Sequence, residues 1–397
     1  MRGFVQNPPL PHNYATELLQ LARGRGVRLW DSAGSRYLDL GAGISVNALG
    51  YGRRDLARIA SRQMRRLVHV SNLYTTEPAV GLAGDLIALL RSRVAEFAAA
   101  QFGNSGAEAN EAAIKYARLY AKRTRGEGHH KILSLESGFH GRTMGALSAT
   151  PNRKYSEPFE PLVPGMASCP FNDVNALNRT LTDEFAGVIV EVVQGEGGLR
   201  VMTREFAEAL NRRCSETGAL LIVDEIQTGL CRVGELFGSE LVGLRPDILT
   251  LSKPLAGGLP LSATMIPAKI NDLLKPGDHG TTFGGGPVTT AVARHVLHIV
   301  TAPGFLASVR ERAAQLTELL ESMVGTSDVV ERRGTGMLQG LALTGDDGSR
   351  VLEVMNKCRE SGVLVLKSGT NVIRIAPPLV ISADELAEGL EILRGAL

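Results

Sequence analysis

The chain has 397 residues, of which 44% are hydrophobic and 21% charged, a balance that excludes an intrinsically disordered protein. Its 43 basic and 41 acidic side chains leave a net charge of +2, so we expect neither a nucleic acid nor an anionic membrane as partner. No apolar run reaches the roughly 18 residues needed to cross a bilayer, and the N-terminus does not resemble a signal peptide.

A chain of this length is too long for one ordinary hydrophobic core and predicts two domains. The four cysteines lie far apart and form no Cys-x-x-Cys pair, so we expect reduced, buried thiols in a cytoplasmic protein. These cysteines are Cys169, Cys214, Cys231 and Cys358.

Strands and helices are predicted to alternate through the middle of the chain. Helical spacing of apolar residues predicts helices at Ala107–Thr124 and Thr203–Thr217. Five short runs rich in Val, Ile and Leu show little alternation, which is typical of strands buried on both faces of a mostly parallel sheet. The five runs are Lys131–Leu135, Gly187–Glu191, Leu220–Asp224, Asp247–Leu251 and Ser262–Ile266. Such alternation predicts an α/β layered architecture.

The C-terminal part has a different pattern. Helices are predicted at Ala291–Val300, Phe305–Val324 and Val351–Ser361, followed by a strand pair at Val363–Leu366 and Val372–Ile375. We therefore expect a large domain over residues 46–286 and a smaller α+β domain over 287–397. Residues 1–45 are expected to pack beside the smaller domain.

One segment resembles the beginning of a dinucleotide-binding fingerprint. Leu38-Asp-Leu is followed by Gly41-Ala-Gly43, but Val46 stands where the third glycine belongs. No acid-tipped second strand follows at the expected distance. These departures disfavour a nicotinamide-dependent enzyme.

A phosphate-binding turn is a better candidate. Residues Phe102 to Asn110 read Phe-Gly-Asn-Ser-Gly-Ala-Glu-Ala-Asn, a glycine-containing turn that runs into a helix. The free backbone N–H groups and the positive end of that helix favour an anion, and the Ser105 hydroxyl can add a hydrogen bond. The same residues could also form a plain N-capped helix.

Two charged residues follow two of the predicted strands. Asp224 ends the run Leu220–Val223, and Lys253 comes directly after Asp247–Leu251 and Ser252. Ligands in open α/β sheets bind at the carboxyl ends of the strands. An amine in apolar surroundings can lose its proton and attack a carbonyl, and pyridoxal phosphate needs such a lysine and an acid for its ring nitrogen. Taken singly, Asp224 could cap a turn and Lys253 could be an ordinary solvated lysine.

His129 and His130 are not expected to bind a metal ion. Adjacent residues on a short loop point in different directions, and no further ligands flank them. We expect both to face solvent and predict no metal site.

Taken together, these segments resemble the class III (ω-amino acid) aminotransferases over nearly the whole chain, most closely the acetylornithine aminotransferase branch. The resemblance implies a pyridoxal-phosphate-dependent enzyme of fold type I, with a large domain built on a mostly parallel sheet and a smaller α+β domain. The motifs that carry it, in order, are Asn104–Lys115, Gly138–Thr143, Gln194–Gly198, Asp224–Gly229, His279–Gly285 and Arg374–Pro378.

The resemblance also implies a role for each matching residue. The implied cofactor residues are Ser105, Gly106 and Ala107 for the phosphate, Phe139 and Ile226 for the two ring faces, Asp224 for the ring nitrogen, Gln227 for the phenolic oxygen and Lys253 for the covalent bond. Asp224 and Lys253 are the implied catalytic pair. Thr282 is expected to reach the phosphate in the neighbouring subunit, so the active unit would be a homodimer.

The implied substrates are an N-acylornithine, with N-acetylornithine first, and 2-oxoglutarate. Arg142, Glu196, Arg374 and Gly43 are the expected substrate-binding residues. Such a reaction belongs to amino-acid biosynthesis, as in arginine formation. The alternatives are an aminotransferase acting on ornithine, succinylornithine, 4-aminobutyrate or a carrier-linked lysine, and an aminomutase relative.

Four departures from the family pattern leave the fine substrate specificity open. They are Val192 in place of a proline, Gly286 in place of an asparagine, Arg53-Arg54 in place of His-Pro, and Pro254 in place of a small residue after the lysine. None of them removes a group with an implied catalytic role.

Overall fold

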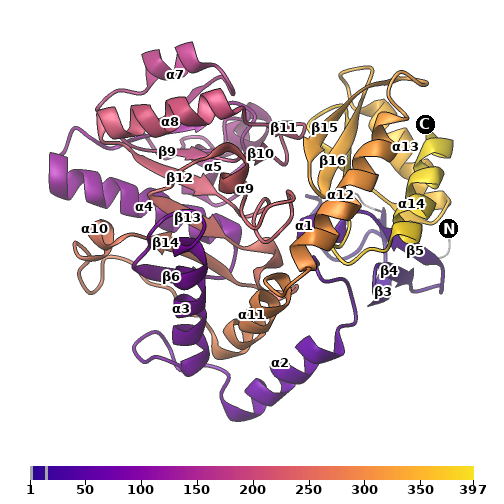
Figure 1. Ribbon diagram of the computed structural model, residues 1–397, viewed down its shortest axis with the longest axis horizontal. Helices are drawn as coiled ribbons and strands as arrows, with labels where there is room; N and C mark the ends of the chain where they lie inside the picture. Colours follow the sequence, from indigo (N-terminus) through magenta and orange to yellow (C-terminus); the bar gives the residue numbers. More distant parts are fainter. Residues whose placement is uncertain (1–2, 14–16) are drawn as a thin grey trace.

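A seven-stranded sheet forms the core of the larger of two units (Figure 1). The computed structural model describes residues 3–13 and 17–397. The strand β14 is antiparallel to both of its neighbours, and all other neighbouring pairs are parallel. In spatial order the strands are β6 (Ala99–Gly103), β14 (Ser262–Ile266), β13 (Ile248–Leu251), β12 (Leu220–Asp224), β9 (Phe185–Val190), β7 (Lys131–Leu135) and β8 (Met166–Cys169). The mostly parallel sheet expected from the sequence is confirmed.

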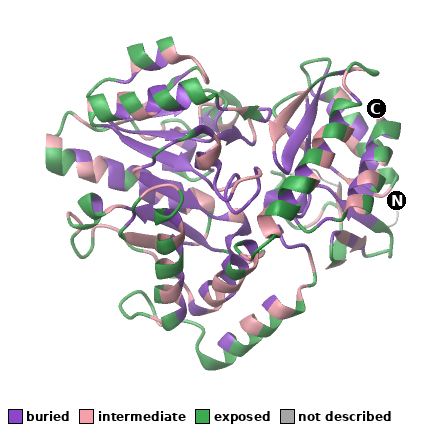
Figure 2. Cartoon of the chain, in the orientation of Figure 1, coloured by how far each residue is buried: buried purple, intermediate pink, exposed green. Residues whose placement is uncertain are grey.

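Helices cover both faces of this sheet. Helix α4 (Gly106–Arg125) packs on one face and α8 (Arg204–Thr217) on the other. Neighbouring residues of one strand pack on opposite faces of the sheet. Ile222 of β12 belongs to the hydrophobic cluster around α4, whereas Val223 belongs to the hydrophobic cluster around α8. Because side chains alternate between faces and both faces are covered, these strands have no alternating pattern. The burial colouring in Figure 2 shows the same arrangement, with buried strands between half-exposed helices.

The smaller unit is built on an antiparallel sheet of four strands, in the order β15-β16-β19-β18. Helix α12 (Phe305–Glu321) packs on β15 and β16, and α13 (Ser349–Glu360) and α14 (Ala383–Ala396) pack beside it. The strands are β15 (Val329–Thr335), β16 (Leu338–Leu343), β18 (Leu366–Ser368) and β19 (Val372–Ile375).

We expected residues 287–397 to form the small domain, and the helix at its start packs differently from the rest. Helix α11 (Pro287–Val300) contacts α2 (Arg54–Arg66), α3 (Glu77–Arg91) and the 3-10 turn η2 (Lys253–Ala256). The chain then bends by 70° before α12. No single helix in residues 3–13 and 17–397 is long and apolar enough to cross a membrane, although the bent pair α11 and α12 passes by length and composition alone.

The N-terminal segment joins the smaller unit through a second sheet. Strands β3 (Leu21–Arg25), β4 (Arg28–Asp31) and β5 (Arg36–Asp39) form a meander, and β17 (Val363–Leu364) pairs in parallel with β5. The strand pair expected at 363–366 and 372–375 is therefore only half right. Its first run is divided, so that β17 pairs with β5 and only β18 pairs with β19. Sequence periodicity cannot reveal this division because it contains no information on the partner of each half.

The remaining elements are short or peripheral. They are β1 (Phe4–Gln6), β2 (Glu17–Leu19), α1 (Ala42–Ser45), α5 (Met144–Ser148), α6 (Arg153–Ser156), η1 (Glu157–Phe159), α7 (Val174–Thr180), β10 (Val193–Gln194), β11 (Arg200–Val201), α9 (Gly238–Val242) and α10 (Ala268–Asn271).

The two units meet closely where Gly336, in the turn between β15 and β16, lies against Val233 of the large unit. A Cβ atom at Gly336 would lie 2.1 Å from the carbonyl carbon of Val233, and the φ of Gly336 is +61°. Both the contact and the backbone conformation therefore require glycine.

We predict that Gly336→Ala is markedly destabilising. Gly26→Ala is the matched control, because Gly26 has a φ of +60° and no atom within 4 Å of its Cβ position. Overpacking should make Gly336→Ala less stable than Gly26→Ala by about 1–3 kcal/mol. Chemical denaturation of both variants measures the difference, and equal stabilities would contradict the close approach.

Candidate active site

A cavity of about 260 Å³ lies at the carboxyl end of the large sheet. Asp224 reaches it from the end of β12, and Lys253 reaches it from the turn after β13. This edge of a parallel sheet is where α/β proteins bind ligands. The cavity is lined by Gly106, Ala107, Phe139, His140, Gly141, Arg142, Glu191, Glu196, Asp224, Ile226, Gln227, Ser252 and Lys253.

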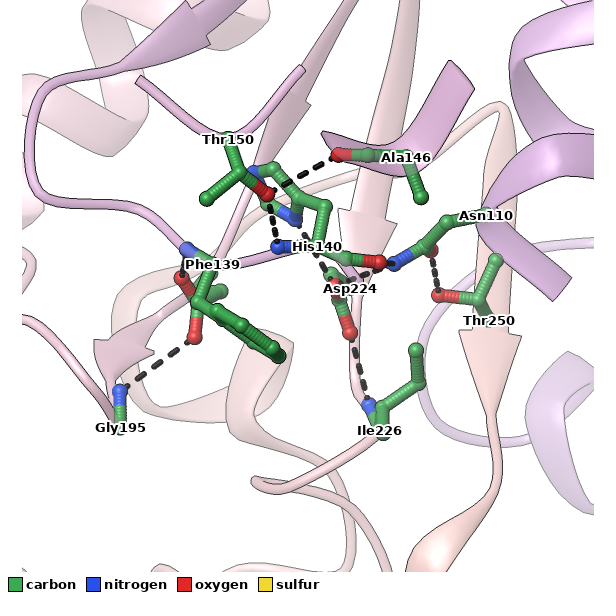
Figure 3. A network of polar contacts seen from close by, with 10 residues as sticks. Asn110, Phe139, His140, Ala146, Thr150, Gly195, Asp224, Ile226 and Thr250 are labelled. Carbon is green, nitrogen blue, oxygen red and sulfur yellow. Dashed lines mark hydrogen bonds and ion pairs between the residues drawn. The ribbon is translucent and has the colours of Figure 1, made fainter. Parts of the chain in front are cut away.

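The carboxylate of Asp224 is held on three sides (Figure 3). Its Oδ2 accepts hydrogen bonds from Asn110 Nδ2 at 2.8 Å and His140 Nδ1 at 2.9 Å. Its Oδ1 accepts one bond, from the Ile226 backbone N–H at 3.0 Å. Asn110 is in turn fixed by the Thr250 hydroxyl, which donates to its Oδ1 at 2.9 Å. Since Oδ1 accepts only this one bond from the described residues, it retains a lone pair for a further donor.

His140 and Glu191 surround this carboxylate with further charge. Burial favours the neutral ring of His140, but the hydrogen bond to Asp224 and the charges of Asp224 and Glu191 outweigh burial and raise its pKa. Burial also raises the pKa of Glu191, which accepts hydrogen bonds from the backbone N–H groups of Phe139 at 2.8 Å and Gly195 at 3.3 Å. Glu191 thereby links the loop before α5 to the turn that bears Glu196.

The amine of Lys253 lies in surroundings that favour its neutral form. Desolvation lowers its pKa, and the positive charge of Arg374 acts in the same direction. The carboxylates of Glu196, Asp224 and Glu191 oppose this shift without cancelling it. A neutral amine can act as a nucleophile or accept a proton, whereas an ammonium group cannot.

The beginning of α4 forms one wall of the cavity. Ser105 is the N-cap of this helix, and its hydroxyl accepts a hydrogen bond from the Glu108 N–H at 3.3 Å. A Cβ atom at Gly106 would lie 2.8 Å from the side chain of Ile226, so only glycine permits this approach. The segment is thus an N-capped helix, and its N-terminal backbone also faces a cavity that can receive an anion.

Arg374 and Glu196 form an ion pair beside the cavity. Arg374 Nη1 lies 2.6 Å from Glu196 Oε1 and donates to the Gly195 carbonyl at 2.8 Å. Arg374 is 2% exposed, and its Nε has no hydrogen-bond partner among the described residues. Glu196 is the more accessible member of the pair, because 27% of its side chain is exposed.

Arg142 lies at the other side of the cavity and is exposed. Its guanidinium carbon is 3.7 Å from the centre of the Tyr155 ring and 5.5 Å from that of Phe139. No ion pair of Arg142 occurs within residues 3–13 and 17–397. This cation is therefore positioned by aromatic rings and available to an acidic ligand.

Four expected site residues are not among those that line this cavity. Arg374 is paired with the lining residue Glu196, and Ser105 directly precedes the lining residue Gly106. Thr282 is exposed and borders a separate hollow of about 60 Å³ that also contacts Asn72 and Gly284. Gly43 is exposed and has a φ of +60°, so any other residue there would strain the backbone. Within one chain, neither Thr282 nor Gly43 lines the cavity beside Lys253.

Five residues of the site were not predicted individually, among them Gly141, which stood within the motif Gly138–Thr143. Asn110 and His140 stood within motifs quoted for other reasons, and Ser252 directly precedes Lys253. Glu191 ends a strand that we read as a buried hydrophobic element. A buried carboxylate at a strand end is the only sequence signal that could have singled it out.

The departures from the family pattern lie outside the Asp224 network. Val192 is fully buried, and Arg53 pairs with Asp55. Pro254 stands in the first turn of η2, and Gly286 is the N-cap of α11. His129 and His130 each donate from Nδ1 to a backbone carbonyl, that of Asp183 at 2.5 Å and that of Glu127 at 3.3 Å. No group of three metal-binding side chains occurs in the described part of the chain.

Comparison with known proteins identifies the family. The profile described as "Aminotransferase class-III" matches residues 10–397. The chain belongs to the class III aminotransferases. It is 43% identical to the mitochondrial acetylornithine aminotransferase of Alnus glutinosa over 387 residues, covering 96% of this chain and 84% of the relative. It is 41% identical to the succinylornithine transaminase of Salmonella typhimurium, covering 93% and 90% of the two chains.

A solved structure agrees in fold. The ornithine aminotransferase of Toxoplasma gondii superposes with a TM-score of 0.92 at 31% identity, covering 98% of this chain and 92% of that one. The fold-type I architecture expected from the sequence is therefore confirmed, and the chain is an aminotransferase.

Class III aminotransferases use pyridoxal phosphate, and the residues of this cavity fit that cofactor. The cofactor requires an amine for its aldehyde carbon, an acid for its ring nitrogen and donors for its phosphate. The cavity offers Lys253, the remaining lone pair of Asp224 Oδ1, and the N-terminal backbone of α4 with Gly106 approaching Ile226 closely.

We predict that the pKa of His140 depends on Asp224. In Asp224→Asn the charge is lost while burial persists, so the pKa of His140 should fall. Since the folded pKa of His140 is raised, the pair stabilises the native chain below the unfolded pKa of about 6.5, and this stabilisation is lost as the pH rises through the raised value.

Histidine-selective NMR titration measures this change. Asp55→Asn is the control, because it removes a carboxylate paired with a different histidine, His295. An unchanged His140 titration in Asp224→Asn would contradict the coupling.

Proposed function

We propose that this chain transfers the terminal amino group of N-acetylornithine, or of a related N-acylornithine, to 2-oxoglutarate. The observation that carries the proposal is the combination, around one cavity, of the pair Lys253 and Asp224 with two separate arginines, Arg142 and Arg374. Both substrates have a carboxylate remote from the reacting carbon, and 2-oxoglutarate has a second one beside it. The names of the relatives support an acylated ornithine as donor.

In this proposal Lys253, Asp224 and their neighbours perform the proton chemistry. Bound pyridoxal phosphate supplies an electron-withdrawing ring that accepts the electron pair left when the substrate carbon loses its proton. Asp224 would hold the proton of the ring nitrogen, oriented by Asn110 and His140. Lys253, whose pKa burial lowers, would remove the proton from the substrate carbon and return one to the cofactor.

The other proposed contacts to the cofactor are those that the family resemblance implies. Ser105, Gly106 and Ala107 would hold the phosphate at the beginning of α4. Phe139 and Ile226, which both line the cavity, would cover the two faces of the ring, and Gln227 would bond its phenolic oxygen. These assignments, with Lys253 and Asp224, make up the proposed cofactor site.

Arg374 and Glu196 would adapt the site to two unlike substrates. Arg374 can bind the carboxylate beside the keto carbon of 2-oxoglutarate with two hydrogen bonds. A terminal amine donor has no carboxylate there, and an unpaired buried arginine would be costly. Glu196 pairs with Arg374 at 2.6 Å and is partly exposed, so it can neutralise Arg374 for one substrate and withdraw for the other.

The active unit is proposed to be a homodimer, in which Thr282 contributes to the phosphate site of the neighbouring subunit. Its exposure, and its distance from the cavity lining of its own chain, agree with such a role. Large apolar side chains near it are also exposed, among them Phe283 at 67% and Tyr74 at 74%. A cytoplasmic location is proposed because all four cysteines are buried free thiols.

An amino-donor panel with 2-oxoglutarate tests the proposed function. We expect N-acetylornithine to exceed free ornithine by at least about tenfold in kcat/KM, which corresponds to roughly 1.4 kcal/mol of transition-state binding. Arg142→Ala should raise the KM of both substrates, because Arg142 would hold the remote carboxylate of each. Better turnover of free ornithine or 4-aminobutyrate would refute the donor assignment, and turnover without any 2-oxo acid would indicate an aminomutase.

Gly43→Tyr refines this panel, since a glycine here is expected to leave room for the acyl group. Its backbone conformation means that any substitution introduces strain. Gly43→Ala therefore serves as control, with the same strain but no ring. Only Gly43→Tyr should lower the ratio of kcat/KM for N-acetylornithine to kcat/KM for free ornithine.

Mixing two impaired variants tests the shared site. Lys253→Ala cannot attach the cofactor, and Thr282→Ala should retain it poorly. A hybrid dimer contains one site with both groups intact, so it should recover about half of the wild-type activity per dimer. Separately tagged chains allow the hybrid to be purified. Activity no higher than that of the Thr282→Ala homodimer would argue against sharing.

A further inference from the structure

Arg232 is a buried cation that joins the two units of the chain. It is 1% exposed and is among the largest fully buried side chains. Its Nη1 donates to the carbonyls of Met337 at 3.0 Å and Pro377 at 2.6 Å. Its own carbonyl accepts the Met337 N–H at 2.8 Å. Three hydrogen bonds thus connect one large-unit residue to two segments of the smaller unit.

The large-unit end of this connection belongs to the loop that follows Asp224. The fully buried carboxylate of Glu225 organises this loop by accepting bonds from Thr228, Gly238 and Ser239. Directly before Arg232, Leu230 and Cys231 have φ values of +53° and +73°. Two consecutive non-glycine residues in this conformation are unfavourable and persist only where the surroundings impose them.

The small-unit end leads to Arg374. Met337 directly precedes β16, and Pro377 lies two residues beyond the end of β19, the strand that contains Arg374. In the pairing of these strands, Gly340 of β16 is opposite Arg374. A displacement of either carbonyl bound by Arg232 would therefore move the strand that carries the Arg374 guanidinium.

The electrostatics argue against a purely packing role for Arg232. No carboxylate of the described residues lies within ion-pair distance of it, and its Nη2 is buried without a partner. Desolvation lowers its pKa to about 9, with Asp39 opposing the shift from a distance. Such a cation is costly to bury, and an apolar residue of similar size would avoid this cost.

We infer that Arg232 is a positioning residue, which sets Arg374 relative to Lys253 and thereby determines the affinity for the 2-oxo acid. The inference rests on the proposed binding of the α-carboxylate of the 2-oxo acid by Arg374. A bidentate contact depends on position to within about 1 Å, and misplacement of that size costs up to about 100-fold in rate. The terminal amine donor makes no such contact, so its half-reaction depends on the position of Arg374 only through the weaker effect of that charge on Lys253.

Arg232→Met tests this inference, because methionine fills the space without donating to the two carbonyls. We expect kcat/KM for 2-oxoglutarate to fall at least about tenfold, while kcat/KM for the donor changes less than about threefold. The dissociation constant of glutarate, an unreactive dicarboxylate, should rise by a similar factor in calorimetric titration. Arg232→Lys, which keeps the charge and can still donate to one carbonyl, should show a smaller loss of the same kind.

Arg125→Met is the matched control. Arg125 donates to the carbonyls of Asp183, Thr217 and Phe185, all within the large unit and away from the cavity. Arg125→Met should lower the melting temperature but should not change kcat/KM for 2-oxoglutarate relative to kcat/KM for the donor. The inference would be overturned if Arg232→Met lowered kcat/KM equally for the donor and for 2-oxoglutarate, or lowered neither. It would also be overturned if Arg125→Met lowered kcat/KM for 2-oxoglutarate selectively. If Arg232→Met does not fold, the same comparison of kcat/KM for the two substrates is made with Arg232→Lys.

The donor panel keeps this test distinct from the proposed function. The Arg232 comparison uses the best donor and acceptor that the wild-type enzyme shows in that panel. A different preferred donor would change the proposed function, whereas the ratio between the half-reactions would still decide the role of Arg232.

Discussion

The site depends on one buried carboxylate and on the groups that hold it. Asp224 is 4% exposed at the end of a strand that is itself buried on both faces. Leaving such an acid without partners would be prohibitive, and three donors from different parts of the chain supply them. Asn110 belongs to α4, His140 to the loop after β7, and Ile226 to the turn after β12, so all three segments contact Asp224. The hydrogen bonds to the Asp224 carboxylate therefore hold together the segments that form the walls of the cavity.

The same principle operates in a second layer. Glu191 accepts N–H groups from Phe139 and Gly195, and the Gly195 carbonyl in turn accepts bonds from Ser368 and Arg374. A single path of hydrogen bonds thus runs from the large sheet to the smaller unit. Together with the bonds of Arg232, this path connects Arg374 to the loops that surround Lys253.

The sequence predicted those features that are encoded locally. The runs at 131–135, 220–224 and 262–266 are strands with the predicted bounds, because their apolar composition reflects burial on two faces. Asp224 and Lys253 come together because parallel strands end at the same edge of the sheet. The family motifs also contained His140 and Asn110, although their bond to Asp224 requires the fold to be known.

Long-range pairing could not be predicted in this way. The run at 363–366 is apolar throughout, and nothing in it shows that β17 pairs with β5 while β18 pairs with β19. Glu191 and Arg232 are single charged residues in apolar surroundings, where a sequence gives no indication of which backbone groups they will meet. Their roles follow from tertiary contacts, and only the structure provides these.

The parallel pairing of β5 with β17 has a consequence for how the chain is made. Leu38 of β5 lies opposite Val363 of β17, so a strand near the N-terminus finds its partner near the C-terminus. During synthesis the N-terminal meander leaves the ribosome with an open edge on β5, which its partner β17 cannot cover until Val363 and Leu364 have been made. Contacts so distant in sequence also slow folding. The sheet that joins the N-terminal segment to the smaller unit is therefore completed only after β17 has emerged, and the nascent chain carries an unpaired strand edge until then.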